Sequence, residues 1–405
     1  MISSFAWRNL WRNKLRSGVI ITAVTLGIFA GIFMIAFMNG MINDRLQSII
    51  GLEMSHIQIH KPGFLDNDQF SIYLSNGDSI VQAIENNQLV QAATKRLIIN
   101  SMVASAETSL GVKIAGVDPK KEQLVTGLSS RIIDGKYLDE TGKNPIVISE
   151  RLAQKLKIGL KNKVVITVQD INQDITGAPF RVVGIYRTDN MLFDEANVYV
   201  RHTDLAHLTG LDASATHEIA IKLRENSATT EATSFLKEQF PSFEVKNWQE
   251  LSPEAGYLSS AMDQYMFIFI VIILMALSFG IVNTMLMVIM ERVRELGMLM
   301  CIGMNRARVF KMIMLETIYL SLTGGVIGVV LGYFISQYFE TAGINLYFWK
   351  DAFAEMGYSA MVYPVIEWHT IIVVSFMVVI AGVLSALYPA YRALKLNPSE
   401  AVRSS

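Results

Sequence analysis

Side chains that could carry acid–base, nucleophilic or metal chemistry are scattered through this 405-residue sequence. His56 and His60 are four residues apart, as in some helical zinc sites. Their segment alternates like a strand, however, and there four residues span about 13 Å, too far to share a metal ion. The sequence contains no phosphate-binding G-x-x-x-x-G-K-[ST] segment, and no Ser/His/Asp or Cys/His arrangement stands out. Catalysis by the chain itself is therefore the weaker hypothesis, and we expect no resident cofactor or metal ion.

The charged residues are unevenly distributed along the chain. They make up 18% of it, against roughly 25% in an average soluble domain. Residues 42–261 hold 49 of the 71 charged side chains and resemble a soluble domain, whereas the other 185 residues are charge-poor. The near-zero net charge of −1 argues against nucleic-acid binding. The apolar composition excludes intrinsic disorder, and the single cysteine excludes a disulfide scaffold.

Four apolar stretches are long enough to cross a bilayer as helices, which takes about 20 residues. Glu316, in the third, is the one charged residue that they contain. The first stretch is longer than the core of a signal peptide and no A-x-A cleavage site follows it, so we predict that it too spans the membrane. The predicted spans are residues 17–41, 265–290, 312–339 and 370–391.

Lysines and arginines near the span ends orient the chain, because such residues stay on the cytoplasmic side. They are frequent at the N-terminus, in the loop 291–311 and in the tail 392–405. The loop 340–369 instead holds Lys350 against four acidic residues. Both termini and the loop after the second span are therefore predicted to be cytoplasmic. The large domain and the loop 340–369 are predicted to lie outside.

The segments next to the spans have helical patterns of their own. Residues 1–16 place arginines on one face and Trp7 and Trp11 mainly on the other, which is typical of a helix lying in the cytoplasmic membrane interface. Residues 42–55 and 250–264 continue the first two spans outward as helix. We therefore expect a stalk beneath the outer domain.

The third predicted span has two unusual features. Gly324, Gly328 and Gly332 are each four residues apart, a spacing that lets another helix approach closely, either within this chain or from a second subunit. Glu316 lies about one turn beyond Lys311. A carboxylate inside a span is a candidate for proton transfer, but no second acid occurs in any span. We therefore favour pairing with a nearby basic residue or a helix start.

The two ends of the outer domain alternate between strands and helices. A β-α-β-β pattern opens the domain and a β-α-β pattern closes it, which predicts one split βαβ unit built from both ends. The opening elements are a strand at 55–60, a helix at 78–88 and strands at 91–98, 101–107 and 110–117. The closing elements are a strand at 218–223, a helix at 228–239 and a strand at 243–246.

The middle of the outer domain, residues 120–212, is predicted to be a β-rich insert. Residues 144–158 favour a strand followed by a short helix, and residues 197–200 favour a further strand. Residues 163–168 and 180–186 alternate around a turn rich in Asp, Asn, Gly and Pro, so they predict a hairpin.

The cytoplasmic loop begins and ends with charges around an apolar helical segment, Leu296 to Ile302. A loop that only orients the spans is one interpretation. An apolar helix exposed to the cytosol should be covered, however, and a partner protein is the natural candidate.

This loop resembles the FtsX/MacB/Lol class of ABC-transporter permeases, whose pattern is E-R-x-R-E-[IL]-G-x-L-x-x-[IL]-G. The tail from Tyr388 to Arg403 resembles the family ending Y-P-A-x-R-A-x-x-x-x-P-x-E-A-[LV]-R, and Trp7 to Arg16 resembles the entry helix. The resemblance covers the whole chain, and the layout is most similar to the lipoprotein-releasing Lol permeases. The residues that match the loop pattern are Glu291, Arg292, Arg294, Glu295, Leu296, Gly297, Leu299, Ile302 and Gly303.

The resemblance implies a fold of four transmembrane α-helices plus a large α+β extracytoplasmic domain, in the inner (cytoplasmic) membrane. The domain would have a Porter-like part, residues 55–119 and 213–249, and a Sabre-like part, residues 120–212. Two permease chains, identical or homologous, would pair within the membrane lipid. A dimer of ATPase subunits, which holds ATP and Mg, would dock on their loops. MacB-type exporters usually carry the ATPase on the same chain. Because this sequence contains no phosphate-binding motif of an ATPase, we expect the ATPase here on a separate chain.

Within this family the loop acts as a coupling helix, here about 291–304. It would pass ATP-driven movement through the stalk to the outer domain without substrate crossing the membrane. The residues that we predict to couple to the ATPase are Glu291, Arg292, Arg294, Glu295, Leu296, Gly297, Met300 and Gly303.

The expected cargo is a lipoprotein, whose acyl chains need an apolar cavity at the outer mouth of the first two spans. Methionine suits such irregular apolar ligands. A periplasmic carrier is a further candidate partner, although the turn at 169–180 matches no clear carrier-binding hook of the Lol permeases. MacB-like efflux and an FtsX-like relay to a periplasmic hydrolase are the alternatives. The candidate cavity residues are Met38, Met41, Met262, Tyr265, Met266 and Phe269.

Overall fold

The computed structural model describes residues 6–8, 11–12, 14–67, 69–139 and 142–394. The predicted interfacial helix 1–16 and the tail 392–405 lie partly outside these residues. The chain divides into two compact units, each described by itself. The first unit lies within residues 1–41, 261–345 and 361–405, and the second comprises residues 42–260 and 346–360.

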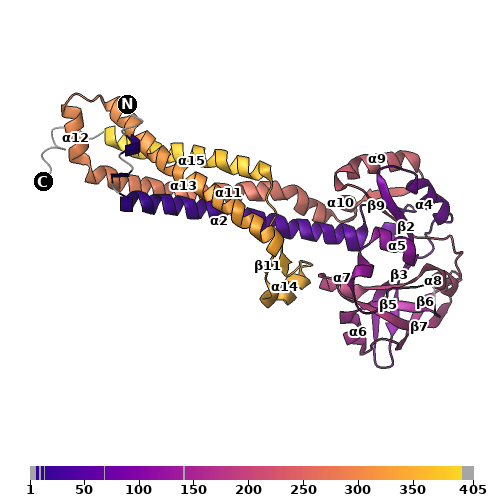
Figure 1. Ribbon diagram of the computed structural model, residues 1–405. Coiled ribbons are helices and arrows are strands. Elements are labelled where there is room, and N and C mark those ends of the chain that lie inside the picture. The colour runs from indigo at the N-terminus through magenta and orange to yellow at the C-terminus, as the bar shows by residue number, and fades with distance from the viewer. Residues whose placement is uncertain (1–5, 9–10, 13, 68, 140–141, 395–405) are drawn as a thin grey trace. The chain divides into compact units, whose positions relative to one another are not determined.

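The first unit is built on four long helices that run side by side (Figure 1). Each helix is long and apolar enough to cross a membrane, which confirms the four predicted spans. All four extend beyond the predicted limits, because their ends continue as polar helix. They are α2 (Lys14–Ser48), α11 (Pro253–Glu291), α13 (Arg306–Ala342) and α15 (Trp368–Leu394).

One apolar core joins these helices. Ile20, Val24, Ile28 and Ile32 recur every fourth residue of α2, so they form a single ridge, and all are buried against the other helices. Two short connections complete the unit: α12 (Val293–Cys301) follows α11, and the strands β11 (Ile344–Asn345) and β12 (Met361–Val362) pair with each other.

The second unit contains one ten-stranded sheet, in the order β10-β1-β9-β2-β3-β8-β5-β7-β4, with β6 pairing with β2 and β7. The strands are β1 (Ile57–His60), β2 (Val90–Ala104), β3 (Ser109–Val117), β4 (Ile132–Gly135), β5 (Pro145–Ser149), β6 (Lys163–Gln169), β7 (Ile175–Tyr186), β8 (Asn197–Arg201), β9 (Glu218–Leu223) and β10 (Glu244–Asn247). The α-helices are α3 (Phe64–Asn67), α4 (Gly77–Glu85), α5 (Pro119–Val125), α6 (Glu150–Leu156), α7 (Met191–Ala196), α8 (His202–Thr209), α9 (Thr229–Gln239), α10 (Trp248–Leu251) and α14 (Lys350–Glu355). Short 3₁₀ or π-helical turns are η1 (Ile49–Met54), η2 (Leu128–Arg131), η3 (Asn226–Ala228) and η4 (Tyr347–Trp349).

The two ends of the domain form two interlocked split βαβ units rather than one. β1 pairs antiparallel with β9 and β10, and β9 pairs antiparallel with β2. In the first βαβ unit, β1-α4-β2, the strand β9 lies between the two parallel strands β1 and β2. In the second βαβ unit, β9-α9-β10, the strand β1 lies between β9 and β10. The helices α4 and α9 contribute Ile84 and Leu236 to a shared apolar core with these strands.

The prediction of separate strands at 91–98 and 101–107 is wrong. They are one strand, β2, because the ladder with β3 continues without a break: Asn100 pairs with Lys113 and Ser101 with Val112. The predicted hairpin is confirmed, since β6 and β7 pair antiparallel from Lys163 to Gln169. The strands of the insert share an apolar core with the helices α6 and α8 and with β2 and β3, which contribute Leu97 and Val112 among others.

A buried ion cluster lies beside these cores. The Arg96 guanidinium donates to Glu122 at 2.8 Å and to Glu218 at 2.6 Å, and all three side chains are almost fully buried. The Arg96 charge is compensated by the two carboxylates, and each carboxylate is compensated by Arg96. These ion pairs therefore hold β2, α5 and β9 in place. They are a structural device, not an open site.

Candidate functional site

The loop between α11 and α13 folds into a short helix between two turns. α11 ends at Glu291, α12 begins after Arg292, and Gly303 at a φ of 104° turns the chain toward α13. Such a positive φ favours glycine. The Asn305 side chain then accepts a hydrogen bond from the Ala307 N–H at 3.1 Å and caps α13. The loop therefore presents a defined helix and not a flexible link.

A network of charges joins the N-terminal segment to α12 and α13. The Arg12 guanidinium donates to both Glu295 carboxylate oxygens, at 2.8 and 2.5 Å. Arg292 donates to Glu295 at 3.0 Å and to Glu316 at 3.1 Å. The hydrogen bonds from Arg12 hold the pKa of the Glu295 carboxyl below its ordinary value, so that this group stays ionised.

The network lines a polar cavity of about 260 Å³ at this end of the helices, together with Glu291, Met285 and Leu320. Glu316 thus pairs with a basic residue, as expected, but the partner is Arg292 from the start of the loop. The neighbour that the sequence suggested, Lys311, precedes Glu316 by five residues, and Arg292 precedes it by 24.

The predicted coupling residues divide between the two faces of the loop. Leu296 and Gly297 are buried, and Met300 packs partly against the helix core. Glu295 and Arg292 face the charge network. The exposed members are Glu291, Arg294 and Gly303.

Two residues that the prediction left out dominate the exposed face. Met298 is 52% exposed and Ile302 is 84% exposed, four residues further along the chain. Arg294, Arg306 and Arg308, which are close to this pair in the sequence, are exposed too. The i, i+4 spacing could have identified this apolar pair, because it puts both side chains on one helix face.

The glycine stripe packs against α2 of the same chain. A Cβ added at Gly324 would come within 2.8 Å of Val24, and one at Gly328 within 2.8 Å of the Thr25 carbonyl. One at Gly332 would meet Ile32 at 2.9 Å. The stripe therefore lets two helix backbones approach within the subunit.

The six predicted cavity residues lie on two helices, Met38 and Met41 on α2 and the others on α11. Met262 is buried and Met266 packs against the helix core, whereas Tyr265 and Phe269 are nearly half exposed. These six residues lie outside the lining of the apolar cavity described below. Their role in cargo binding stays a prediction.

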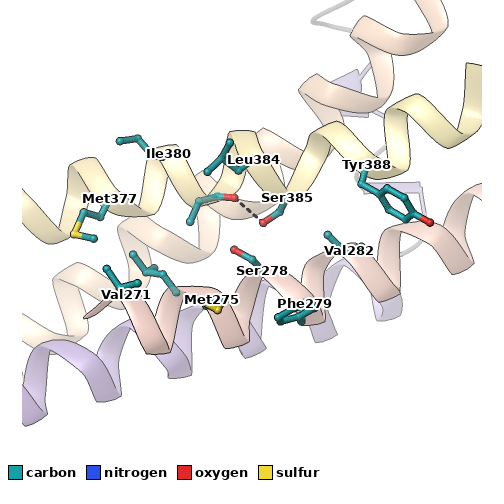
Figure 2. A pocket seen from close by; sticks show the side chains of 12 residues that line it. Val271, Met275, Ser278, Phe279, Val282, Met377, Ile380, Leu384, Ser385 and Tyr388 are labelled. Carbon is teal, nitrogen blue, oxygen red and sulfur yellow. Dashed lines mark hydrogen bonds between the residues drawn. The ribbon is translucent and has the colours of Figure 1, made fainter. Parts of the chain in front are cut away.

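An apolar cavity of about 610 Å³ instead lies between α11 and α15 (Figure 2). Side chains from both helices converge on it, and Ser278 and Ser385 are the hydroxyl groups nearest its middle. The Ser385 hydroxyl donates to the Ala381 carbonyl of its own helix at 2.6 Å. The lining residues are Val271, Leu274, Met275, Ser278, Phe279, Val282, Met377, Ile380, Ala381, Leu384, Ser385 and Tyr388.

No metal centre is found in the part of the chain that the structure describes, where no three His, Cys, Asp or Glu side chains gather suitably. His56 and His60 face different partners: His56 lies beside the Leu223 N–H, and His60 beside the His217 carbonyl and Gln58.

Comparison with known proteins gives two family matches. Residues 17–238, more than half of the chain, match the MacB-like periplasmic core domain, and residues 267–398 match the FtsX-like permease C-terminal domain. Four candidate spans, a helical loop between the second and third of them and an α+β domain agree with these two matches, which are to membrane-embedded permeases. The chain belongs to the FtsX/MacB/Lol-type ABC transporter permeases.

Individual relatives are distant. The chain is 23% identical to the lipoprotein-releasing system transmembrane protein LolC of Neisseria meningitidis, over 82% of this chain and 83% of that protein. It is 25% identical to the macrolide export ATP-binding/permease protein MacB of Shewanella, over 90% of this chain but 54% of that protein. The chain thus spans about half the length of the second relative. The periplasmic region of MacB from Actinobacillus actinomycetemcomitans aligns with 50% of this chain at 18% identity and a TM-score of 0.36.

Proposed function

We propose that this chain is the permease subunit of a transporter in the inner membrane, with both termini in the cytoplasm. It pairs with a second permease chain and is driven by a dimer of separate ATPase subunits, which bind ATP and Mg. The ATPase moves α12, and the long helices α2 and α11 carry that movement to the extracytoplasmic domain. The cargo is a lipoprotein, which is released from the membrane without crossing it.

The exposed face of α12 is the observation that carries the coupling part of this proposal. Met298 and Ile302 form an apolar pair that is exposed in the described part of the chain, and exposed arginines lie close to it in the sequence. An apolar centre with a charged rim is typical of a protein docking surface. On the other face, the Arg12–Glu295–Arg292 network ties α12 to the helices that it would move.

Replacing Ile302 with Asp tests the docking surface. The variant should lose most of the stimulation of the ATPase subunit in reconstituted vesicles, since a desolvated carboxylate cannot replace an apolar anchor. Ile175→Asp is the matched control, because Ile175 is 82% exposed but lies in the extracytoplasmic unit. Normal stimulation of the Ile302→Asp variant would contradict docking through this face.

The choice of a lipoprotein cargo rests on the match with the Neisseria lipoprotein-releasing protein, which covers more than four fifths of both chains. The match to MacB over 90% of this chain supports efflux of periplasmic peptides, toxins or drugs as the second candidate. The match to the FtsX-like permease domain keeps a relay to a periplasmic hydrolase as a third.

A release assay separates these candidates. Vesicles holding the permease, its ATPase and a labelled triacylated lipoprotein should release the lipoprotein on addition of ATP. Phe269→Asp should block release while ATPase activity continues. Phe376→Asp is the control, because Phe376 is also an exposed phenylalanine in a predicted span but lies on α15. ATP-dependent binding or expulsion of soluble peptide, without lipoprotein release, would instead favour the MacB-like function.

A further inference from the structure

The connection between α13 and α15 contains an exposed aromatic cluster. Within η4, Tyr347 is 62% exposed, Phe348 88% and Trp349 55%. The Phe348 and Trp349 rings meet edge to face at 5.2 Å, and the Lys350 ammonium lies 4.7 Å from the centre of the Tyr347 ring. Tyrosine, tryptophan and lysine together are typical of side chains at a membrane–water interface.

The short ladder beside this cluster is fixed at the end of a span. Asn345 of β11 pairs with Met361 of β12. Just after β12, the Val365 N–H donates to the Ala36 carbonyl of α2 at 2.9 Å. A Cβ added at Gly40 of α2 would lie 2.1 Å from the Tyr363 carbonyl, so the two backbones are in direct contact. Ala36 and Gly40 are in the last two turns of the first predicted span.

Chain length then keeps the cluster near the bilayer surface. Phe348 follows Asn345 by three residues, which can reach at most about 11 Å. The headgroup region is roughly 5–7 Å thick on each side of the hydrocarbon core. The loop lies on the same side as the large domain, because the chain crosses the membrane twice between them, in α11 and α13. Phe348 therefore stays near the leaflet that faces the extracytoplasmic domain.

The other side of the same segment is attached to the extracytoplasmic unit. Residues 346–360 belong to that unit, and α14 packs against α7. Gly357, at a φ of 76°, is buried against the guanidinium of Arg45, where an added Cβ would come within 2.9 Å. The Asp351 carboxylate oxygen Oδ1 lies 3.9 Å from the guanidinium nitrogen Nη2 of Arg151, which belongs to the insert.

Arg45 itself belongs to a partly buried group of hydrogen-bonded side chains. It donates to Glu53 at 2.5 Å, and Glu53 also accepts from the Asn190 amide at 2.9 Å. The Asn190 side-chain oxygen Oδ1 accepts hydrogen bonds from the Leu192 and Phe193 N–H groups and so caps α7. The segment 346–360 is thus tied through Gly357 and Arg45 to the end of α2 and to the start of α7.

We propose that residues 346–360 form a membrane-interface anchor of the extracytoplasmic domain. Tyr347, Phe348 and Trp349 insert among the headgroups and upper acyl chains of the adjacent leaflet, while α14 and Gly357 hold the domain. The ligand is the phospholipid surface. The inference requires the chain to span a membrane and does not depend on the cargo.

Spin-label accessibility in lipid nanodiscs tests the anchor. Cys301, the single cysteine, is replaced by Ser, and Phe348→Cys is labelled in the full chain. Because Phe348 is 88% exposed, this change removes little packing. The discs contain phosphatidylethanolamine and phosphatidylglycerol, and collisions with oxygen, which partitions into lipid, are compared with collisions with a water-soluble nickel chelate.

Two labelled sites calibrate the measurement. Ile175→Cys, in the extracytoplasmic unit, serves as the water-exposed site, and Phe376→Cys, on α15, as the lipid-exposed site. The oxygen-to-nickel ratio at position 348 should exceed that at position 175 several-fold and approach that at position 376. A ratio equal to that at position 175 would overturn the proposal. Low access to both reagents would overturn it too, because it would mean that a protein surface covers the cluster.

Discussion

Arg292 is the side chain on which the charge network of the loop between α11 and α13 depends. It is part-buried and contacts two carboxylates, Glu295 at the loop surface and Glu316 inside the helix bundle. Only 9% of the Glu316 side chain is exposed. A buried carboxylate is tolerated while its basic partner remains. Removing the partner leaves an uncompensated buried charge, which lowers the stability of the fold. The same arginine thus links the exposed α12 to the interior of α13.

Replacing Arg292 with Met should lower the free energy of unfolding by about 3 kcal/mol, because it takes a main partner from a buried carboxylate. Thermal unfolding of the purified chain in detergent measures the loss. Adding Glu316→Gln to the Arg292→Met variant should recover much of it, since the neutral amide carries no charge to desolvate. If the Arg292→Met variant alone is as stable as the parent, the ion pair between Arg292 and Glu316 contributes little to stability.

A second residue-scale prediction concerns pH. His202 is buried, its Nε2 lies 2.9 Å from the Ala215 carbonyl, and burial lowers its pKa to about 4. Its pKa in the unfolded chain is about 6.5, so below that value the unfolded state binds the proton more readily. The stability that His202 contributes is therefore complete above pH 6.5 and lost as the pH falls toward 4.

The difference in melting temperature between the parent and His202→Gln isolates this effect from other titrating groups. The parent should be the more stable at pH 7.5, and the difference should shrink or reverse by pH 4.5. A pH-independent difference for His202→Gln would contradict protonation at this site.

At the scale of elements, the contact between α2 and α13 is a backbone packing surface. Gly324, Gly328 and Gly332 face the ridge of β-branched residues on α2, and the Thr25 hydroxyl donates to the Gly324 carbonyl at 3.1 Å. Membrane helices lack a hydrophobic drive to associate, so this close packing and hydrogen bonding must supply the affinity.

Gly328→Ala should therefore destabilise the bundle by about 1–3 kcal/mol, since its Cβ would overlap the Thr25 carbonyl and Ile28. Gly280→Ala is the matched control, because an added Cβ there meets nothing within 4 Å. The control should be neutral or stabilised by up to about 1 kcal/mol through helix propensity. Equal effects of the two substitutions on detergent unfolding would argue against a tightly packed stripe.

At the scale of the whole molecule, α2 and α11 each belong to both compact units. The division falls after Met41 in α2 and before Ala261 in α11, inside continuous helices. Helical hydrogen bonding that runs through both divisions is what a mechanical link requires, because a helix transmits displacement along its axis.

Inserting four glycines after Ile42 should uncouple the two units. ATPase stimulation should remain, since the proposed docking loop that contains α12 is unchanged, while cargo release is lost. Four alanines at the same place lengthen the helix but preserve its rigidity, so that this variant should retain more release than the glycine variant. Release by the glycine variant at the parental rate would mean that the movement does not pass through α2.

Much of this architecture follows from the sequence because it depends on local composition. Apolar length determines the four spans, and the alternation of residues 163–168 and 180–186 marks a hairpin before any fold is known. The loop pattern from Glu291 to Gly303 indicates the family. The break expected between residues 98 and 101 was wrong because strand ends depend on the neighbouring strand, here β3.

The tertiary structure decided which partner each residue meets. Glu316 pairs with Arg292 instead of Lys311, the glycine stripe meets α2, and Met298 and Ile302 remain on the exposed face of α12. Tertiary packing also placed the large apolar cavity between α11 and α15, and tied residues 346–360 to the extracytoplasmic unit. Spacing along one helix fixes which side chains share its face, but only the packing of distant segments determines what that face touches.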